Sequence, residues 1–174
     1  MGVGKGIWNE KNYPASQEEF KFEFLGLVAF NDPPKANMIQ TIKTFRDAGI
    51  HVKIITGDYA ETAVAIAKQI QLSSSYDFLT GKEVLELSKE ELRVKVKTIN
   101  IFARMFPEAK LKVIDALKEN GEVVAMTGDG VKDTPALKAA HIGIAMGKRG
   151  SEAAKAVASI VITDDDSGHM TDAV

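Results

Sequence analysis

The chain has 174 residues, 45% of them hydrophobic and 26% charged, which is enough for one domain with its own hydrophobic core. The formal net charge is -2, and the 24 acidic and 22 basic residues are scattered, so charge does not favour a nucleic-acid partner. Cysteine is absent, which excludes disulfides, thiolate nucleophiles and cysteine-based zinc sites. No apolar run reaches the roughly 18 residues that cross a bilayer, and the first residues lack a signal-peptide core, so we expect the isolated chain to be cytoplasmic.

In the first half of the chain, apolar runs alternate with helical patterns. Pro33 and Pro34 end the first run because proline cannot continue a strand ladder, and Gly49 is placed to cap the first helix. The expected elements are a flexible glycine-rich start at 2–6, a strand over 22–30, a helix over 36–47, a strand over 52–55 and a helix over 60–70.

The second half continues the alternation. Ser88 is a predicted N-cap, with Glu91 at the capping-box position. The expected elements are a loop over 73–76, a helical region over 81–98, a strand over 99–103, a helix over 107–117, a strand over 123–126, a helix over 134–140, a strand over 142–145, a helix over 151–158 and a strand over 160–162. Because these strands are apolar without a period of two, the pattern predicts an α/β fold, a three-layer open parallel sheet covered on both faces.

The tripeptide Thr-Gly-Asp follows a short apolar strand twice, at 56–58 and at 127–129. Ligands of open parallel sheets bind at the carboxyl ends of the strands, where these residues would meet. Threonine hydroxyls and backbone N–H groups suit phosphate oxygens, and carboxylates suit Mg²⁺. Each copy alone also fits a plain strand-to-helix turn with an aspartate N-cap.

Asp129 and Asp133 are four residues apart, a spacing at which like charges are unfavourable unless a cation lies near both. Mg²⁺ or a lysine would serve. Lys110 follows Pro107 near a predicted helix start at the same edge of the sheet, where its charge would face a phosphoryl group. The alternative for Lys110 is a solvated helix lysine.

Residues 127–137, T-G-D-G-V-K-D-T-P-A-L, resemble the hinge motif T-G-D-G-V-N-D-A-P-A-L of P-type ATPases. Residues 32–35, D-P-P-K, are similar to the family's D-P-P-R, and Arg104 with residues 107–110 matches its A-R-x-x-P-E-x-K. The resemblance covers about residues 24–165 and is nearest to the calcium-pump-like branch. It implies a haloacid dehalogenase-like (Rossmann-like) fold, Mg²⁺ as cofactor, and ATP and phosphate as ligands of the parent pump.

Carried over to this sequence, the resemblance implies a magnesium and phosphate site. Asp129 would be the Mg²⁺ ligand, with Asp133 as its supporting carboxylate. Thr56 and Gly57 would contact the phosphoryl oxygens, and Asp58 would organise their loop.

The same resemblance assigns four cationic residues. Lys110 would neutralise the transferring phosphoryl group, while Arg104 and Lys35 would lie near the nucleotide. Lys132 stands where the family has asparagine, so it would add a positive charge beside the phosphate. We expect it to pair with Asp129 or Asp133 and to weaken Mg²⁺ binding.

The family's phosphorylated aspartate lies in a D-K-T-G-T motif, which these 174 residues do not contain. We therefore expect a catalytically inactive fragment of a cation pump whose partner is the rest of the pump. Its expected divisions are a remnant of the nucleotide-binding domain at 1–23, the phosphorylation domain at 24–165 and a tail at 166–174 leading toward a membrane helix.

In the family the missing strand is central, between the strands that end at Thr56 and Thr127. The sequence offers residues 25–30 as a replacement, which would bring Asp32 to the nucleophile's position; strand exchange between chains is the other solution. A self-contained phosphatase using Asp32 is a second functional hypothesis, although the prolines after Asp32 argue against it. A third is a regulatory module that forms a homodimer through the unpaired edge.

Overall fold

The computed structural model of the protein describes residues 1–8, 11–30 and 33–173. The chain forms two compact units, Met1–Pro33 and Pro34–Val174. The predicted divisions at 1–23, 24–165 and 166–174 stay predictions. Among the described residues, none of the helices combines the length and the apolar character that crossing a bilayer requires.

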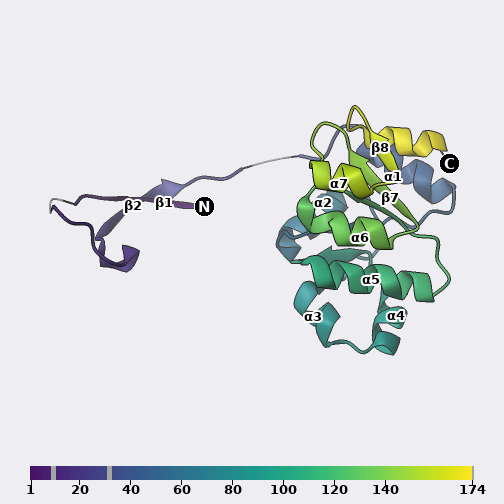
Figure 1. The fold of residues 1–174 in the computed structure, drawn as a ribbon, viewed down its shortest axis with the longest axis horizontal. Coiled ribbons are helices and arrows are strands. Elements are labelled where there is room, and N and C mark those ends of the chain that lie inside the picture. The colour runs from purple at the N-terminus through teal and green to yellow at the C-terminus, as the bar shows by residue number, and fades with distance from the viewer. Residues whose placement is uncertain (9–10, 31–32, 174) are drawn as a thin grey trace. The chain divides into compact units, whose positions relative to one another are not determined.

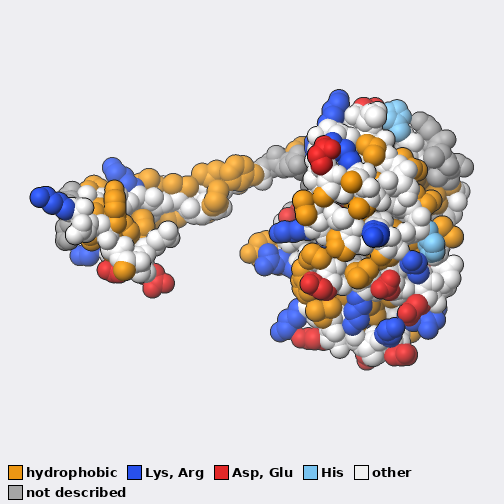
Figure 2. Space-filling model, in the orientation of Figure 1, with side chains coloured by type: hydrophobic (Ala, Val, Ile, Leu, Met, Phe, Trp, Pro, Cys, Tyr) orange, Lys and Arg blue, Asp and Glu red, His pale blue; other side chains and the backbone are white. Residues whose placement is uncertain are grey.

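The first unit is a two-stranded antiparallel sheet of β1 (Gly2–Gly6) and β2 (Phe22–Leu27). A short 3-10 turn, η1 (Gln17–Glu19), precedes β2 and is capped by the Ser16 side chain. Figure 2 shows hydrophobic side chains exposed along this unit, and Phe24 is 69% exposed. An isolated two-stranded sheet is only marginally stable in water.

Two predictions about this unit are wrong. The glycine-rich start at 2–6 is not irregular but forms β1, because ladder hydrogen bonds come from the backbone and need no side chains. The segment 25–30 does not replace a central strand of the parallel sheet, since β2 pairs with β1 in a separate antiparallel sheet. Asp32 lies outside the described residues, so its predicted role stays a prediction.

The described part of the second unit contains six strands in two parallel three-stranded sheets. In the first sheet the order is β3 (Ile54–Ile55), β5 (Ile101–Ala103), β4 (Phe78–Thr80). In the second it is β6 (Ala125–Gly128), β7 (Ile142–Met146), β8 (Ile160–Ile162). The strands are parallel, as predicted, and no ladder joins β3 to β6 among the described residues.

Seven α-helices surround these sheets in the described part of the second unit, connected by short loops and two 3-10 segments. The α-helices are α1 (Met38–Asp47), α2 (Ala60–Gln69), α3 (Gly81–Glu86), α4 (Lys89–Thr98), α5 (Pro107–Glu119), α6 (Thr134–Ala139) and α7 (Glu152–Val157). The 3-10 segments are η2 (Val131–Asp133) and η3 (Ser167–Ala173). The predicted 81–98 region is two helices, and Ser88 begins the second with the predicted Glu91 capping box. The sequence pattern did not predict the strand β4.

Helix α5 packs against both sheets and joins them. Its residues Ala109 and Val113 are fully buried in a cluster with Phe102 of β5. Ile114, on the same helix, belongs to another cluster with Met126 of β6. Figure 1 shows α5 running across the unit, with α6 on one side and α3 and α4 on the other. The two sheets therefore share one helical layer although their strands do not pair.

The opposite face of the first sheet is covered by α1 and α2. Ala63 and Ala67 of α2 are buried with Ile42 of α1 against Ile101. Helix α1 also packs beside η3 near the end of the second sheet. The Asn37 side-chain amide donates to the Asp166 carboxylate, with 2.9 Å between Nδ2 and Oδ1. Helices thus lie on both faces of the parallel strands, which confirms the predicted three-layer α/β arrangement.

Candidate phosphate and magnesium site

The first Thr-Gly-Asp motif is fixed at the carboxyl end of β3. The Thr56 N–H donates to the Phe102 carbonyl at 2.9 Å, and the Thr56 carbonyl accepts from the Met105 N–H at 2.9 Å. The Thr56 hydroxyl oxygen accepts from the Asp58 N–H at 3.1 Å, which makes a local turn. This turn holds the Thr56 side chain at the edge of the sheet.

The second motif continues β6 and approaches the next helix closely. A Cβ atom on Gly128 would lie 2.6 Å from the Cβ of Asp133, so only glycine fits there without a shift. The Asp133 carboxylate accepts from the Gly130 N–H, with 3.1 Å between nitrogen and Oδ2. The Asp129 carbonyl accepts from the Ser151 N–H at 2.7 Å, just before α7. The two aspartates are therefore held by different backbone contacts.

Lys110 and Asp133 form a buried ion pair with 2.5 Å between Nζ and Oδ1. The two side chains are only 10% and 12% exposed. The alternative interpretation of Lys110 as a solvated helix lysine is wrong. Because Lys110 lies in the first turn of α5 and Asp133 just before α6, the pair links the helices that pack on the two sheets.

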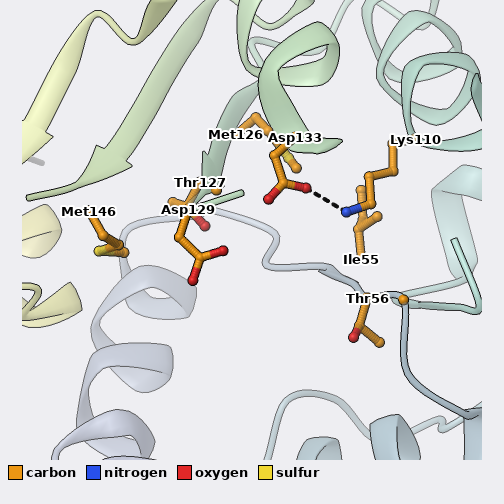
Figure 3. A pocket seen from close by; sticks show the side chains of 10 residues that line it. Ile55, Thr56, Lys110, Met126, Thr127, Asp129, Asp133 and Met146 are labelled. Atoms are coloured by element: carbon orange, nitrogen blue, oxygen red, sulfur yellow. Dashed lines mark hydrogen bonds and ion pairs between the residues drawn. The ribbon is translucent and has the colours of Figure 1, made fainter. Parts of the chain in front are cut away.

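A cavity of about 350 Å³ lies between the carboxyl ends of β3 and β6 (Figure 3). It is lined by residues from both motifs and by both members of the ion pair, together with three apolar side chains: Ile55, Thr56, Gly57, Lys110, Met126, Thr127, Gly128, Asp129, Asp133 and Met146. Thus five of the predicted site residues, which come from separate parts of the sequence, line one cavity.

Four of the predicted site residues do not line this cavity. Asp58 is exposed, and its carbonyl accepts from the Arg104 N–H at 2.8 Å. Lys35 donates through Nζ to the Asp165 carbonyl. Lys132 is exposed, and within the described ranges it has no ion pair with Asp129 or Asp133. The expected pairing of Lys132 with Asp129 or Asp133 is therefore wrong, because Asp133 is paired with Lys110 instead. The roles of these four residues in ligand binding stay predictions.

Arg104 makes a contact that the sequence pattern did not predict. Its guanidinium carbon lies 4.5 Å from the centroid of the Tyr59 ring, a cation–π arrangement. Arg104 also has φ +51, a left-handed conformation that is uncommon outside glycine. No local sequence pattern predicts this contact, because Tyr59 and Arg104 belong to different strand-to-helix connections that only the fold brings together.

The carboxylates of the cavity suit a hard cation whose other ligands are water or phosphate oxygens. Asp129 is exposed and points into the cavity in Figure 3, whereas Asp133 is already bonded to Lys110 and to the Gly130 N–H. In the part of the chain that the structure describes, no three His, Cys, Asp or Glu residues gather into a metal cage. Mg²⁺ typically binds through one or two carboxylates, water and phosphate oxygens. A site with the single exposed carboxylate of Asp129 therefore suits Mg²⁺ better than it suits a transition metal, which needs several protein ligands.

Comparisons with known proteins identify the family of this chain. The family of haloacid dehalogenase-like hydrolases matches residues 2–141. A calcium-transporting ATPase of Bacillus subtilis is 46% identical over 159 residues, covering 91% of this chain and 18% of that protein. The human calcium-transporting ATPase type 2C member 2 is 43% identical, and the match covers 88% of this chain and 16% of that protein. The chain spans less than a fifth of these relatives.

A solved structure supports the fold independently. The catalytic domain of the CPx-ATPase CopB-B matches with a TM-score of 0.62 at 23% identity, covering 88% of this chain and 47% of that one. At this identity the match shows the fold alone. The family match over residues 2–141 shows that the chain belongs to the haloacid dehalogenase-like hydrolases, and its sequence relatives are calcium- and other cation-transporting ATPases.

Proposed function

We propose that this chain is the magnesium- and phosphoryl-binding part of the phosphorylation domain of an ATP-driven P-type cation pump. Calcium is the ion that the names of its relatives favour. The observation that carries the proposal is the convergence of Thr56, Lys110, Asp129 and Asp133 on one cavity. In the pump, the ligands would be ATP and phosphate, and the partner would be the rest of the polypeptide.

The residues that line the cavity would have different roles. Asp129 would hold Mg²⁺, which when bound neutralises charge on phosphate oxygens. The Thr56 hydroxyl and the Gly57 N–H would donate to phosphoryl oxygens at the end of β3. Lys110 would add a positive charge, and Asp133 would keep that lysine in place through their ion pair.

The chain itself would not hydrolyse ATP. The D-K-T-G-T motif that carries the phosphorylated aspartate in P-type ATPases does not occur in these 174 residues. Among the described residues, no strand pairs with both β3 and β6. We therefore propose a binding half-site that needs the remainder of the pump for turnover.

Calorimetric titration tests this proposal. Inorganic phosphate is titrated into the full chain with and without Mg²⁺, and we expect binding that depends on Mg²⁺. Asp129→Asn should abolish the Mg²⁺ dependence, because it removes the exposed carboxylate of the cavity. Asp115→Asn is the matched control, since Asp115 is exposed on α5 and does not line the cavity. Equal behaviour of the two variants would refute the proposal.

A further inference from the structure

The loop after β7, residues 147–150, connects the wall of the cavity to α7. Met146, the last residue of β7, lines the cavity together with Asp129 (Figure 3). At the other end of the loop, the Ser151 N–H donates to the Asp129 carbonyl at 2.7 Å. The position of Asp129, which is the proposed Mg²⁺ ligand, therefore depends on where this loop lies.

The loop is packed tightly against itself and its neighbours. A Cβ atom on Gly150 would overlap the Met146 carbonyl oxygen, so the two ends of the loop lie against each other. The Gly147 N–H donates to the Ile162 carbonyl at 2.8 Å, and the Gly147 carbonyl accepts from the Lys155 ammonium at 3.2 Å. Because closely packed segments transmit displacements, a contact that holds one part of this loop also holds the rest.

The Asp165 carboxylate holds the middle of the loop. Its Oδ1 accepts from the Lys148 N–H and its Oδ2 accepts from the Arg149 N–H, each at 2.9 Å. Asp165 is only 8% exposed, whereas Lys148 and Arg149 are exposed. Hydrogen bonds to an ionised carboxylate are stronger than those between neutral groups. The carboxylate therefore anchors the backbone of the loop and leaves its two basic side chains in solvent.

The backbone of Asp165 is in an uncommon conformation. Its φ is +61, in the left-handed region that residues with a Cβ atom rarely adopt. Its carbonyl accepts from the Lys35 ammonium. A residue keeps such a conformation only where the surrounding contacts compensate for its higher free energy. The contacts of Asp165 with Lys35 and with loop 147–150 do this.

We propose that Asp165 is a positioning residue for the magnesium site. Through loop 147–150 and the Ser151 N–H, it holds the backbone of Asp129 so that the Asp129 carboxylate points into the cavity. The inference rests on the proposed function, because Asp129 is the proposed Mg²⁺ ligand. Asp165 does not line the cavity, so it would contact neither the metal nor the phosphate.

Asp164 provides a matched control, because it is the adjacent carboxylate and has other partners. It is exposed, its Oδ1 accepts from the Asp166 N–H at 3.1 Å, and its Oδ2 lies 2.8 Å from Nε2 of His169. In the described part of the chain, Asp164 has no hydrogen bond to loop 147–150. A variant of Asp164 therefore changes the charge of this region without releasing the loop.

The first test needs neither magnesium nor phosphate. NMR of the isotopically labelled full chain measures the scalar coupling across the hydrogen bond from the Ser151 N–H to the Asp129 carbonyl, and the hydrogen exchange of the Ser151 amide. Asp165→Gly retains a residue that adopts positive φ freely but removes both acceptor oxygens. We expect it to abolish the coupling and to speed exchange at Ser151 about tenfold, with the buried amide of Ile101 unchanged. Asp164→Asn should change neither quantity.

The second test is a titration with Mg²⁺ alone, followed through the amide signal of Asp129. Asp165→Gly should weaken Mg²⁺ binding about tenfold. Asp165→Asn retains one acceptor oxygen and should weaken binding less, about threefold, whereas Asp164→Asn should bind like the parent. A role in stability alone would appear in urea denaturation and would leave the Mg²⁺ affinity of the folded variants unchanged. If Asp165→Gly does not fold, Asp165→Asn carries both tests.

Two results would overturn the inference. One is a Ser151 coupling that the variants of Asp165 leave unchanged, and the other is an equal loss of this coupling in Asp164→Asn. Absence of Mg²⁺ binding by the parent chain would count against the proposed function, whereas parent binding that Asp165→Gly leaves unchanged would count against this inference alone. The metal-free coupling decides whether Asp165 positions Asp129 in either case.

Discussion

The ion pair between Lys110 and Asp133 is the contact on which the geometry of the cavity depends most. Both side chains are about nine-tenths buried, and the Asp133 carboxylate also accepts from the Gly130 N–H. Removing one partner of a buried pair leaves the other charge uncompensated, which is more costly than losing the attraction alone. The pair therefore matters for stability as well as for the position of Lys110.

Asp133→Asn should lower the free energy of unfolding by about 3 kcal/mol, because it leaves the Lys110 ammonium buried without a counter-charge. Urea denaturation followed by circular dichroism measures this change. Asp115→Asn, an exposed change of the same kind on α5, should stay within about 0.5 kcal/mol of the parent. The double variant Lys110→Met with Asp133→Asn should recover part of the loss. A loss below about 1 kcal/mol in the single variant would show that the pair is not buried.

The two glycines of the Thr-Gly-Asp motifs should respond differently to alanine. Gly128→Ala should cost about 2 kcal/mol, since the new Cβ would lie 2.6 Å from the Cβ of Asp133. At Gly57 the nearest atom is the Met105 carbonyl oxygen at 3.7 Å, an ordinary contact, so Gly57→Ala should not destabilise the fold. Thermal unfolding of the two variants compares them directly. Equal loss at both positions would contradict the close packing at Gly128.

At the scale of elements, one helix cap was predicted correctly from the local sequence. The Ser88 and Glu91 capping box was predicted and is present. A second box, between Thr80 and Glu83 at the start of α3, was missed because the strand β4 before it was not recognised. Caps depend on residues three positions apart, so local sequence contains the whole signal.

The missed capping box gives a prediction for pH dependence. Hydrogen bonds from the Thr80 hydroxyl and from the Thr80 N–H lower the pKa of Glu83 below its ordinary value. A carboxyl whose pKa is depressed on folding stabilises the fold above its unfolded-state pKa, and this contribution is lost as the pH falls through the folded-state value. Thr80→Val should raise the pKa of Glu83 and reduce this acid-dependent contribution.

Carbon-detected NMR titration of the Glu83 carboxyl measures that shift. Thr80→Ser keeps a hydroxyl at the same position and should leave the pKa depressed. If valine and serine at position 80 gave the same titration curve, the backbone N–H alone would account for the lowered pKa.

Contacts between residues distant in the sequence could not be predicted from local patterns. The motifs at Thr56 and Asp129 were placed correctly at strand ends, because apolar runs and Thr-Gly-Asp are local patterns. The pairing of β2 with β1 was not predicted, since the choice of strand partner depends on residues about 20 apart in the chain. The resemblance to P-type ATPases supplied what periodicity could not: which strand ends lie side by side.

At the scale of the whole molecule, the second unit contains its own core. Among the described residues, the members of the three buried clusters run from Ile42 onward, so none of them belongs to the first unit. Removing residues 1–33 should therefore leave the free energy of unfolding of the second unit within about 1 kcal/mol of the parent.

Circular dichroism at 222 nm is the appropriate probe for this truncation, because the single tryptophan, Trp8, lies in the first unit. Urea curves of the full chain and of residues 34–174 give the comparison. A loss of more than about 2 kcal/mol would mean that the first unit packs into the core of the second.

The central claim is that residues distant in sequence form one phosphate and magnesium site. Its most direct test is two-dimensional NMR of the isotopically labelled chain during addition of inorganic phosphate with Mg²⁺. The account predicts that the amide signals of Gly57, Gly128 and Asp129 move together along one saturation curve, while those of Gly49 and Gly121 stay fixed. Independent curves, or shifts spread evenly over the glycines, would contradict a single site between β3 and β6.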